Sequence, residues 1–255
     1  MTEHTTPIAL ITGGSRGLGR NTAQHLARRG HDVVITYRQR ADEAQSLVDE
    51  VRALGRQALA LPLDTADIAS FPAFVQALRD GLQGQWGRTR FDHLVNNAGT
   101  GLHRPFAETG EAEFDALVGV HLKGVYFLTQ ALLPLIADGG RIVNLSSGLA
   151  RFSLPGASAY AMMKGGIEVF TRYLAKALAP RGITANTVAP GAIATDFGGG
   201  RVRDDAATRQ AVSQLTALGR AGVPDDIGPV IASLLAPGMG WVTGQRLEAS
   251  GGMLL

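Results

Sequence analysis

A single α/β domain with a doubly wound parallel sheet is the fold class that the sequence predicts. Short apolar runs, typical of buried strands, alternate with helix-like stretches along most of the 255 residues. No linker, repeat or low-complexity stretch interrupts this alternation, which is the pattern of one continuous sheet. Glycine is abundant, at 33 residues, as expected where many turns join strands to helices. We therefore expect one domain over residues 1–255, with a flexible N-terminus at about residues 1–6.

The first half of the chain should hold four strands and the helices between them. The expected strands are four short apolar runs, at residues 8–12, 33–36, 58–61 and 91–95. A helical stretch should follow the first run and end at residue 29. Two more helices are expected over residues 42–54 and about 70–83, with a loop around residues 86–87.

The second half continues the alternation. A long helical region is expected over residues 111–137, bent near 119–124 and interrupted at Pro134. Strands are expected at 141–145, 183–188 and 244–248, and helices at about 157–178, stopped by Pro180, and at 224–235. Residues from about 196 to 217 are polar, rich in glycine at first and then helix-like. We expect them to form a flap on the substrate side of a ligand site.

Composition excludes several classes of function. The chain has no cysteine, which excludes disulfides, thiolate ligands and a cysteine nucleophile, and fits a reducing cytoplasm. The net charge of +2 is too small to indicate nucleic-acid binding, and the six histidines show no metal-ligand spacing. Residues 1–7 lack the apolar core of a signal peptide, and no run of about 18 apolar residues suggests a membrane span. We expect a cytoplasmic protein without metal, nucleic-acid or membrane partners.

A glycine-rich turn follows the first expected strand and opens the first helix. Gly13, Gly17 and Gly19 stand in the order G-x-x-x-G-x-G. Glycines let the backbone approach a ligand closely, and the amides at a helix start point toward it, which suits a pyrophosphate. A glycine-rich turn without a ligand is the alternative, but the position between strand and helix favours a dinucleotide.

The end of the second strand indicates which dinucleotide. A unit that prefers NAD carries an acidic residue here to bind the ribose 2′-hydroxyl, whereas this chain has Tyr37 and Arg38, with Arg40 just beyond. A guanidinium attracts a 2′-phosphate, and Arg16 in the glycine turn could add a second. We therefore predict NADP(H) rather than NAD(H). Solvated loop arginines are the alternative reading of this pattern.

Polar residues also stand where other strands should end. Asp64 could accept a hydrogen bond from an adenine amino group, or cap a turn. Asn96 and Asn97 could satisfy backbone groups beside a ligand cleft. Ligands of doubly wound sheets bind beyond the carboxyl ends of the strands, where the glycine turn, these residues, Ser147 and Pro190 all fall.

Tyr160 and Lys164 are the candidate catalytic pair. Four residues apart on an expected helix, they share one face, beside a strand end that carries Ser147. A phenol has a pKa of about 10, and a neighbouring ammonium favours the phenolate and lowers that pKa. Such a group can pass a proton between a carbonyl and an alcohol. Taken alone, the pattern favours an ordinary buried tyrosine and a surface lysine.

Together these motifs resemble the short-chain dehydrogenase/reductase family, and among its members those similar to 3-oxoacyl-[acyl-carrier-protein] reductases. Ser147 lies thirteen residues before Tyr160, which is the spacing of the family. The resemblance runs from about residue 8 to residue 252 and implies a Rossmann-type fold. The matching residues are Thr12, Gly13, Gly17, Gly19, Asp64, Asn96, Asn97, Ala98, Gly99, Ser147, Tyr160, Lys164, Pro190, Gly191 and Thr195.

The resemblance implies a role for each matching residue. Ser147 would bind the substrate oxygen, Tyr160 would pass the proton, and Lys164 would bind the nicotinamide ribose and lower the pKa of Tyr160. Ser147, Tyr160, Leu149, Leu154 and Phe197 would contact the substrate. The expected cofactor-binding residues are Gly13, Ser15, Arg16, Gly17, Leu18, Gly19, Tyr37, Arg38, Asp64, Thr65, Asn96, Ala98, Gly99, Tyr160, Lys164, Pro190, Gly191, Ile193 and Thr195.

Two positions depart from the family pattern. His121 stands where members usually carry an asparagine that supports a water in the proton relay. An imidazole can also donate or accept, so a relay role and a purely structural role both stay open. Ser250 stands where an aspartate more often precedes the two final glycines, and we expect no effect of this change on the chemistry.

The expected function is NADP(H)-dependent interconversion of a ketone or aldehyde and a secondary alcohol. A 3-oxoacyl thioester is the first substrate class to consider, with sugars, steroids and small ketones left open. The alternative is a catalytically idle NADP-binding sensor or regulatory protein, although such relatives usually lose the tyrosine or the lysine. An enoyl reductase would need a wider spacing between these two residues. The family also implies a homotetramer or dimer formed through the two long helices.

Overall fold

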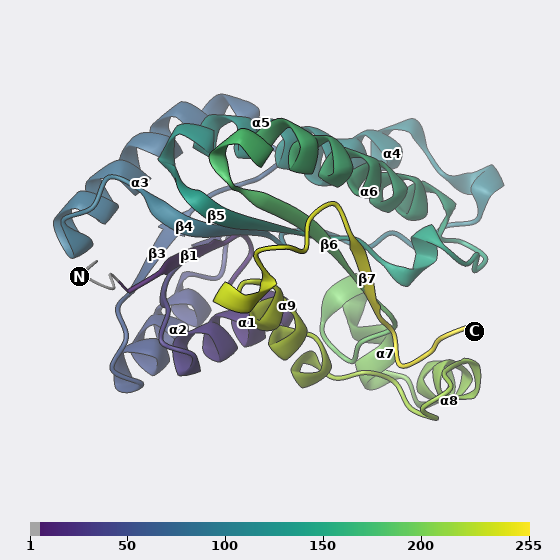
Figure 1. Cartoon of the computed structure of the whole chain (residues 1–255). Helices are drawn as coiled ribbons and strands as arrows, with labels where there is room; N and C mark the ends of the chain where they lie inside the picture. The colour runs from purple at the N-terminus through teal and green to yellow at the C-terminus, as the bar shows by residue number, and fades with distance from the viewer. Residues whose placement is uncertain (1–5) are drawn as a thin grey trace.

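The computed structural model describes residues 6–255, so most of the expected flexible N-terminus lies outside the described residues. Within residues 6–255, seven parallel strands form one sheet in the order β3-β2-β1-β4-β5-β6-β7 (Figure 1). This confirms the doubly wound parallel sheet. The strands are β1 (Ile8–Ile11), β2 (Asp32–Tyr37), β3 (Ala58–Pro62), β4 (Phe91–Asn96), β5 (Ile136–Leu145), β6 (Thr184–Pro190) and β7 (Arg246–Ala249).

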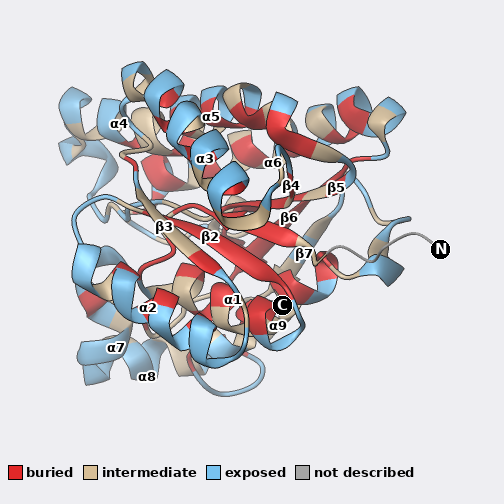
Figure 2. Cartoon of the chain, turned by 90° about the vertical axis from the view of Figure 1, so that its left-hand side faces the viewer, coloured by how far each residue is buried: buried red, intermediate tan, exposed pale blue. Residues whose placement is uncertain are grey.

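Helices cover both faces of the sheet. On one face lie α1 (Gly17–Arg28), α2 (Ala41–Ala53) and α9 (Gly228–Leu234), and on the other lie α3 (Phe71–Trp86), α4 (Glu111–Val118), α5 (Val125–Leu132) and α6 (Ser158–Leu178) (Figure 1). Each face has its own apolar core, and the central strands are buried between the two layers (Figure 2). The strand order reverses between β1 and β4, where such sheets place their ligand crevice.

The stretch expected as a flap contains two short helices, α7 (Arg201–Asp204) and α8 (Ala206–Leu215). Three glycines in a row, residues 198–200, have positive φ angles of 62°, 80° and 77° and turn the chain into α7. The Asp205 carboxylate then begins α8, because it accepts hydrogen bonds from the amides of Ala207 (3.0 Å) and Thr208 (3.3 Å). The flap is therefore a largely helical element beside the sheet.

Some element boundaries differ from expectation. The long helical region ends at Leu135 rather than residue 137, because Pro134 lies in a tight 3₁₀ turn, Leu133–Leu135, that leads directly into β5. β5 begins at Ile136 rather than residue 141, with a shift in register between the pairs Phe91–Ile136 and His93–Arg141. The intervening Asp-Gly-Gly sequence looks like a turn, which hides this irregular part of the strand. α3 also continues to Trp86, three residues beyond its expected end.

The bend expected near residues 119–124 is a π-helical segment, Gly119–Gly124, between α4 and α5. Such segments insert an extra residue into a helix turn and often occur at functional sites. Gly124 is required here, because a Cβ atom at this position would lie 2.1 Å from the backbone oxygen of Thr65. The segment turns His121 into the protein interior, where it is fully buried.

The helical run Glu111–Leu135 is long and apolar enough to cross a membrane by length and composition alone, with a mean hydropathy of 1.4. The run is apolar only on average, because it contains His121, Lys123 and Gln130, so the expectation of no uninterrupted run of about 18 apolar residues is not contradicted. In the fold, however, this run contributes Leu128, Leu132 and Leu135 to the core against the sheet. The core helix of a globular domain meets the same criteria, so the run is weak evidence for a membrane span.

Candidate active site

A cavity of about 390 Å³ opens at the carboxyl ends of the strands, on both sides of the point where the strand order reverses. Its walls come from the glycine turn, the ends of β2, β4, β5 and β6, helix α6 and the start of the flap. The expected cofactor-binding residues that line it are Gly13, Arg16, Gly17, Leu18, Tyr37, Arg38, Asp64, Thr65, Ala98, Gly99, Tyr160, Lys164, Pro190, Gly191, Ile193 and Thr195.

Five expected site residues, Ser15, Gly19, Asn96, His121 and Leu154, do not line the cavity. Asn96 instead turns into the core, where its amide donates to the oxygens of Thr129 (3.0 Å) and Asn144 (2.8 Å). Successive side chains of a strand point to opposite faces, so the choice between neighbouring residues cannot be made from the strand end alone. Asn97, the next residue, lines the cavity.

Asn97 fixes the glycine turn against the end of β4. Its side-chain amide donates to the backbone oxygens of Thr12 (2.9 Å) and Gly13 (3.0 Å). The Thr12 hydroxyl accepts from the amides of Asn97 and Ala98, each at 3.0 Å. Gly13 and Gly17 have φ angles of 63° and 55°, in the left-handed region that favours glycine. The turn is thus pre-shaped, with the side-chain-free cradle that a pyrophosphate requires.

The two arginines near the cavity differ in their partners. Arg38 lines the cavity beside Asp64, with 3.9 Å between Nη1 and Oδ2, and its side chain is 55% exposed. Arg16 pairs with Asp196 at the start of the flap, at 2.5 Å. Asp64 also shapes its own turn by accepting from the amide of Ala66 at 2.9 Å. Both arginines therefore have a carboxylate partner, but the contact of Arg38 is the looser of the two, which leaves its guanidinium better placed to bind a ligand.

Ser147, Tyr160 and Lys164 come together in the cavity. Ser147 follows β5 and begins a short 3₁₀ turn, where its hydroxyl accepts from the amide of Leu149 at 3.2 Å. Its side chain also hydrogen-bonds Tyr160 on α6. Lys164, one helical turn further along α6, donates from Nζ to the backbone oxygen of Leu145 (2.8 Å) and lies 5.5 Å from the Tyr160 ring centroid. All three residues are buried and line the cavity.

Burial dominates the electrostatics of this trio. It raises the pKa of Tyr160, and the hydrogen bond with Ser147 opposes that rise only in part. Burial also lowers the pKa of Lys164 to about 7. The expected net lowering of the Tyr160 pKa is wrong for this structure, because removing the phenolate from water raises the pKa by more than the hydrogen bond with Ser147 lowers it. Tyr160 is therefore a protonated donor at neutral pH.

His121 packs behind the tyrosine without lining the cavity. Its ring meets that of Tyr160 edge to face, with 5.3 Å between centroids. Nε2 lies 2.8 Å from the backbone oxygen of Thr100, and Nδ1 is buried without a hydrogen-bond partner. Burial and, secondarily, the charge of Lys164 lower the pKa of His121 to about 3. The imidazole is neutral, and its relay role stays a prediction.

The substrate side of the cavity is apolar. Leu149 and Phe197 line it as expected, and the Phe197 ring lies 5.8 Å from that of Tyr160. Sequence reasoning missed several lining residues next to expected strand ends and motifs, where position alone could have indicated them. They are Thr36, Leu63, Thr100, Val120, Leu145, Ser146, Ala192, Asp196 and Val202.

The arrangement suits proton transfer at an oxygen of a small molecule. The hydroxyls of Ser147 and Tyr160 face one space, beside a cradle for a dinucleotide. In the part of the chain that the structure describes, no group of three or more His, Cys, Asp or Glu side chains could hold a metal ion.

Comparison with known proteins covers nearly the whole chain. Residues 13–254 match a family model described as enoyl-(acyl carrier protein) reductase. The 3-oxoacyl-[acyl-carrier-protein] reductase of Synechocystis is 34% identical over 258 residues, which span all of both chains.

Two solved structures are also similar. The angucycline C-6 ketoreductase LanV, crystallised with NADP, has a TM-score of 0.92 and 34% identity over 97% of this chain and 95% of its own. A short-chain dehydrogenase/reductase from Serratia marcescens has a TM-score of 0.89 and 32% identity over 98% of both chains. The chain therefore belongs to the short-chain dehydrogenase/reductase family.

Proposed function

We propose that this protein is an NADP(H)-dependent oxidoreductase that interconverts a ketone or aldehyde and a secondary alcohol. The observation that carries the proposal is the convergence of Ser147, Tyr160 and Lys164 in one cavity with the glycine turn. A catalytically idle NADP-binding protein is the alternative. It would have no need for a buried lysine beside a buried tyrosine, since removing an amine and a hydroxyl group from water is unfavourable.

Each residue of the trio has a distinct task in reduction. Ser147 donates its hydroxyl proton in a hydrogen bond to the substrate carbonyl oxygen and so orients that oxygen toward Tyr160. Tyr160 transfers its phenolic proton to the same oxygen as the alcohol forms, and its raised pKa keeps the proton available until that moment. Lys164 places its side-chain nitrogen against the Tyr160 ring, 5.5 Å from the ring centroid, where it donates to the backbone oxygen of Leu145. The bound nicotinamide supplies the hydride when present.

The cofactor proposed is NADP(H), because an arginine rather than an acidic residue follows β2. Arg38 lines the cavity just after β2 and would bind a ribose 2′-phosphate, and the similar structure of LanV was solved with NADP bound. The glycine turn fits the rest of the nucleotide. Gly17 has a positive φ of 55°, which favours glycine, and a Cβ atom placed there would lie in ordinary contact with the Asp196 carboxylate, at 3.7 Å.

The proposed substrate is a 3-oxoacyl thioester. The support is the similarity to the Synechocystis enzyme and the apolar wall formed by Leu149 and Phe197. A ring ketone is the second candidate, which the similarity to the ketoreductase LanV favours. The family model carries an enoyl-reductase description, but the spacing of four residues between Tyr160 and Lys164 supports carbonyl reduction.

The test is oxidation of NADPH followed at 340 nm with two probes, acetoacetyl-coenzyme A and 1-tetralone. We expect turnover with at least one of them, and a preference for NADPH over NADH. Tight NADPH binding with no turnover of any carbonyl in a wider ketone panel would support the idle binding protein instead.

Replacing Arg38 with glutamine should lower the preference for NADPH. The loss of a charge-assisted hydrogen bond to a phosphate weakens binding by roughly 1.5–3 kcal/mol, so the KM for NADPH should rise about tenfold or more. The KM for NADH should stay nearly constant, because it has no 2′-phosphate. Arg40→Gln is the matched control, since Arg40 pairs with Glu43 and lies outside the cavity. Equal changes for both cofactors would contradict the assignment.

We also propose that two copies associate through α5 and α6. These helices expose Tyr126, Phe127, Val169 and Tyr173, which border a second apolar hollow between them. Apolar patches of this kind mark protein interfaces. Light scattering should give a dimeric or tetrameric mass, and Tyr173→Glu should lower it. A monomeric wild type would refute the proposal. The cytoplasmic location expected from the lack of cysteine stays a prediction.

A further inference from the structure

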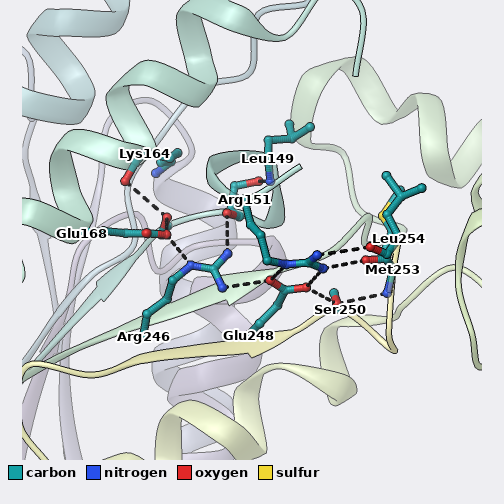
Figure 3. Close-up of polar contacts among 11 residues, drawn as sticks. Leu149, Arg151, Lys164, Glu168, Arg246, Glu248, Ser250, Met253 and Leu254 are labelled. Atoms are coloured by element: carbon teal, nitrogen blue, oxygen red, sulfur yellow. Dashed lines mark hydrogen bonds and ion pairs between the residues drawn. The ribbon is translucent and has the colours of Figure 1, made fainter. Parts of the chain in front are cut away.

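Behind the catalytic trio, four charged side chains form a network between α6, β7 and the turn after Ser147 (Figure 3). Arg246 of β7 is its centre, donating to Glu168 at 2.6 Å and to Glu248 at 2.8 Å. A third bond, at 3.3 Å, goes to the backbone oxygen of Ser147. Glu168 also accepts from the hydroxyl of Ser146 at 2.7 Å. The strand end that carries Ser147 is thus attached to β7.

Arg151, four residues after Ser147, extends the network to residues 250–255 (Figure 3). Its guanidinium donates two hydrogen bonds, of 2.8 Å and 2.7 Å, to the two carboxylate oxygens of Glu248, in the bidentate geometry typical of arginine. It also donates to the backbone oxygens of Met253 (2.7 Å) and Leu254 (3.1 Å). One side chain therefore joins the turn after Ser147 to residues 250–255.

Residues 250–255 in turn hold the end of the flap. The amides of Ala217 and Leu218 donate to the backbone oxygens of Gly252 (3.2 Å) and Gly251 (3.0 Å), and the amide of Leu254 donates to Leu215 at 2.9 Å. Leu254 has a φ of 51°, in the region that disfavours a leucine. A strained backbone of this kind persists only where its surroundings fix it, and the Arg151 bond is one such constraint.

Ser250 fits this network because it is neutral. Its hydroxyl donates to Glu248 at 2.7 Å and accepts from the amide of Met253 at 3.2 Å. An aspartate here would place a second carboxylate beside Glu248, where like charges repel. The bonds from Arg151 and its other neighbours instead lower the pKa of Glu248 to about 2, so its charge is held.

We propose that Arg151 and Glu248 are positioning residues that set the width of the substrate side of the cavity. They connect the turn that carries Leu149 with the end of the flap at residues 215–218, and the start of the same flap carries Phe197 on the opposite wall. The proposal rests on the proposed carbonyl chemistry, because it assigns these residues to substrate positioning. Neither side chain lines the cavity, so both act through the backbone that they hold.

The test compares Arg151→Gln, Arg151→Lys and the control Arg181→Gln. Arg181 also bonds a carboxylate, Asp138 at 2.7 Å, and a backbone oxygen, Leu133 at 2.9 Å, but it lies outside the cavity. Hydrogen exchange of peptides covering residues 212–220 and 250–255 is measured in the NADPH-bound protein. We expect about tenfold faster exchange in Arg151→Gln, partial rescue by lysine, and no change in the control.

Kinetics distinguish substrate positioning from a purely structural role, because a purely structural role would not change the KM for the ketone selectively. With whichever probe the wild type reduces, Arg151→Gln should raise the KM for the ketone about fivefold or more, while the KM for NADPH changes less than about twofold. Unchanged exchange, or equal increases in both KM values, would overturn the proposal. Should Arg151→Gln not fold, Glu248→Gln takes its place under the same criteria. A wild type that reduces neither probe counts against the proposed function alone, since the exchange arm still tests the connection.

Discussion

Replacing Tyr160 with phenylalanine is expected to lower kcat by a factor between about 10² and 10⁴, the usual contribution of a positioned general acid. The variant keeps the ring that packs against His121 and Phe197 and removes only the hydroxyl. Without that hydroxyl, Ser147 can still donate a hydrogen bond to the carbonyl oxygen, but the group that transfers a proton to this oxygen is gone. The measurement is NADPH oxidation under saturating ketone, together with the Kd of NADPH from fluorescence titration.

The affinity for NADPH should change little in this variant, because the phenol contributes mainly to the chemical step. The melting temperature should also stay near that of the wild type, or rise slightly, since a buried polar group is removed together with its desolvation penalty. Turnover that survives at wild-type rate would show that Tyr160 is not the acid. A loss of NADPH binding of the same size as the loss of kcat would show that it acts in cofactor binding instead.

Gly19→Ala is expected to have the second large effect, on both stability and cofactor binding. A Cβ atom at this position would lie 2.3 Å from the backbone oxygen of Gly13 and 2.6 Å from the side-chain nitrogen of Asn97. The glycine turn would have to move away from α1 and lose its bonds to Asn97. Overpacking of this kind lowers the free energy of unfolding by about 1–3 kcal/mol, which corresponds to roughly 3–10 °C in melting temperature.

Gly84→Ala in α3 is the matched control, because nothing lies within 4 Å of a Cβ atom there. Replacing an exposed helical glycine by alanine should stabilise the protein by about 0.5–1 kcal/mol. Calorimetry gives the melting temperatures, and fluorescence titration gives the Kd of NADPH, which should rise only in Gly19→Ala. Equal behaviour of the two variants would show that the turn does not need the close approach of α1.

The sequence predicted the position of the site because the ends of buried strands can be recognised from the ends of short apolar runs. The glycine turn, Arg38 and Asp64 line one cavity, as their positions after apolar runs predicted, and Tyr160 and Lys164 line it from one face of α6. Sequence reasoning chose Asn96 over Asn97 because a motif gives positions and not side-chain directions. It also missed that β5 begins at residue 136, since a glycine-containing irregularity in a strand looks like a turn.

Contacts between distant parts of the chain could not be predicted from the sequence. Arg16 looks like a second phosphate ligand in sequence, yet its partner Asp196 lies 180 positions away. The direction of the Tyr160 pKa shift was also misjudged, because it depends on how deeply the phenol is buried. Burial is a property of the assembled fold, whereas the charge of a neighbouring lysine is visible in the sequence.

The ion pair between Arg16 and Asp196 has a thermodynamic consequence. It joins the turn that is shaped for the nucleotide to the first residue of the flap, so a molecule that displaces either partner also alters the other. Occupancy at the two ends of the cavity is then linked, and linkage is reciprocal. Whatever factor the nucleotide imposes on the affinity for the carbonyl compound, the carbonyl compound must impose on the affinity for the nucleotide.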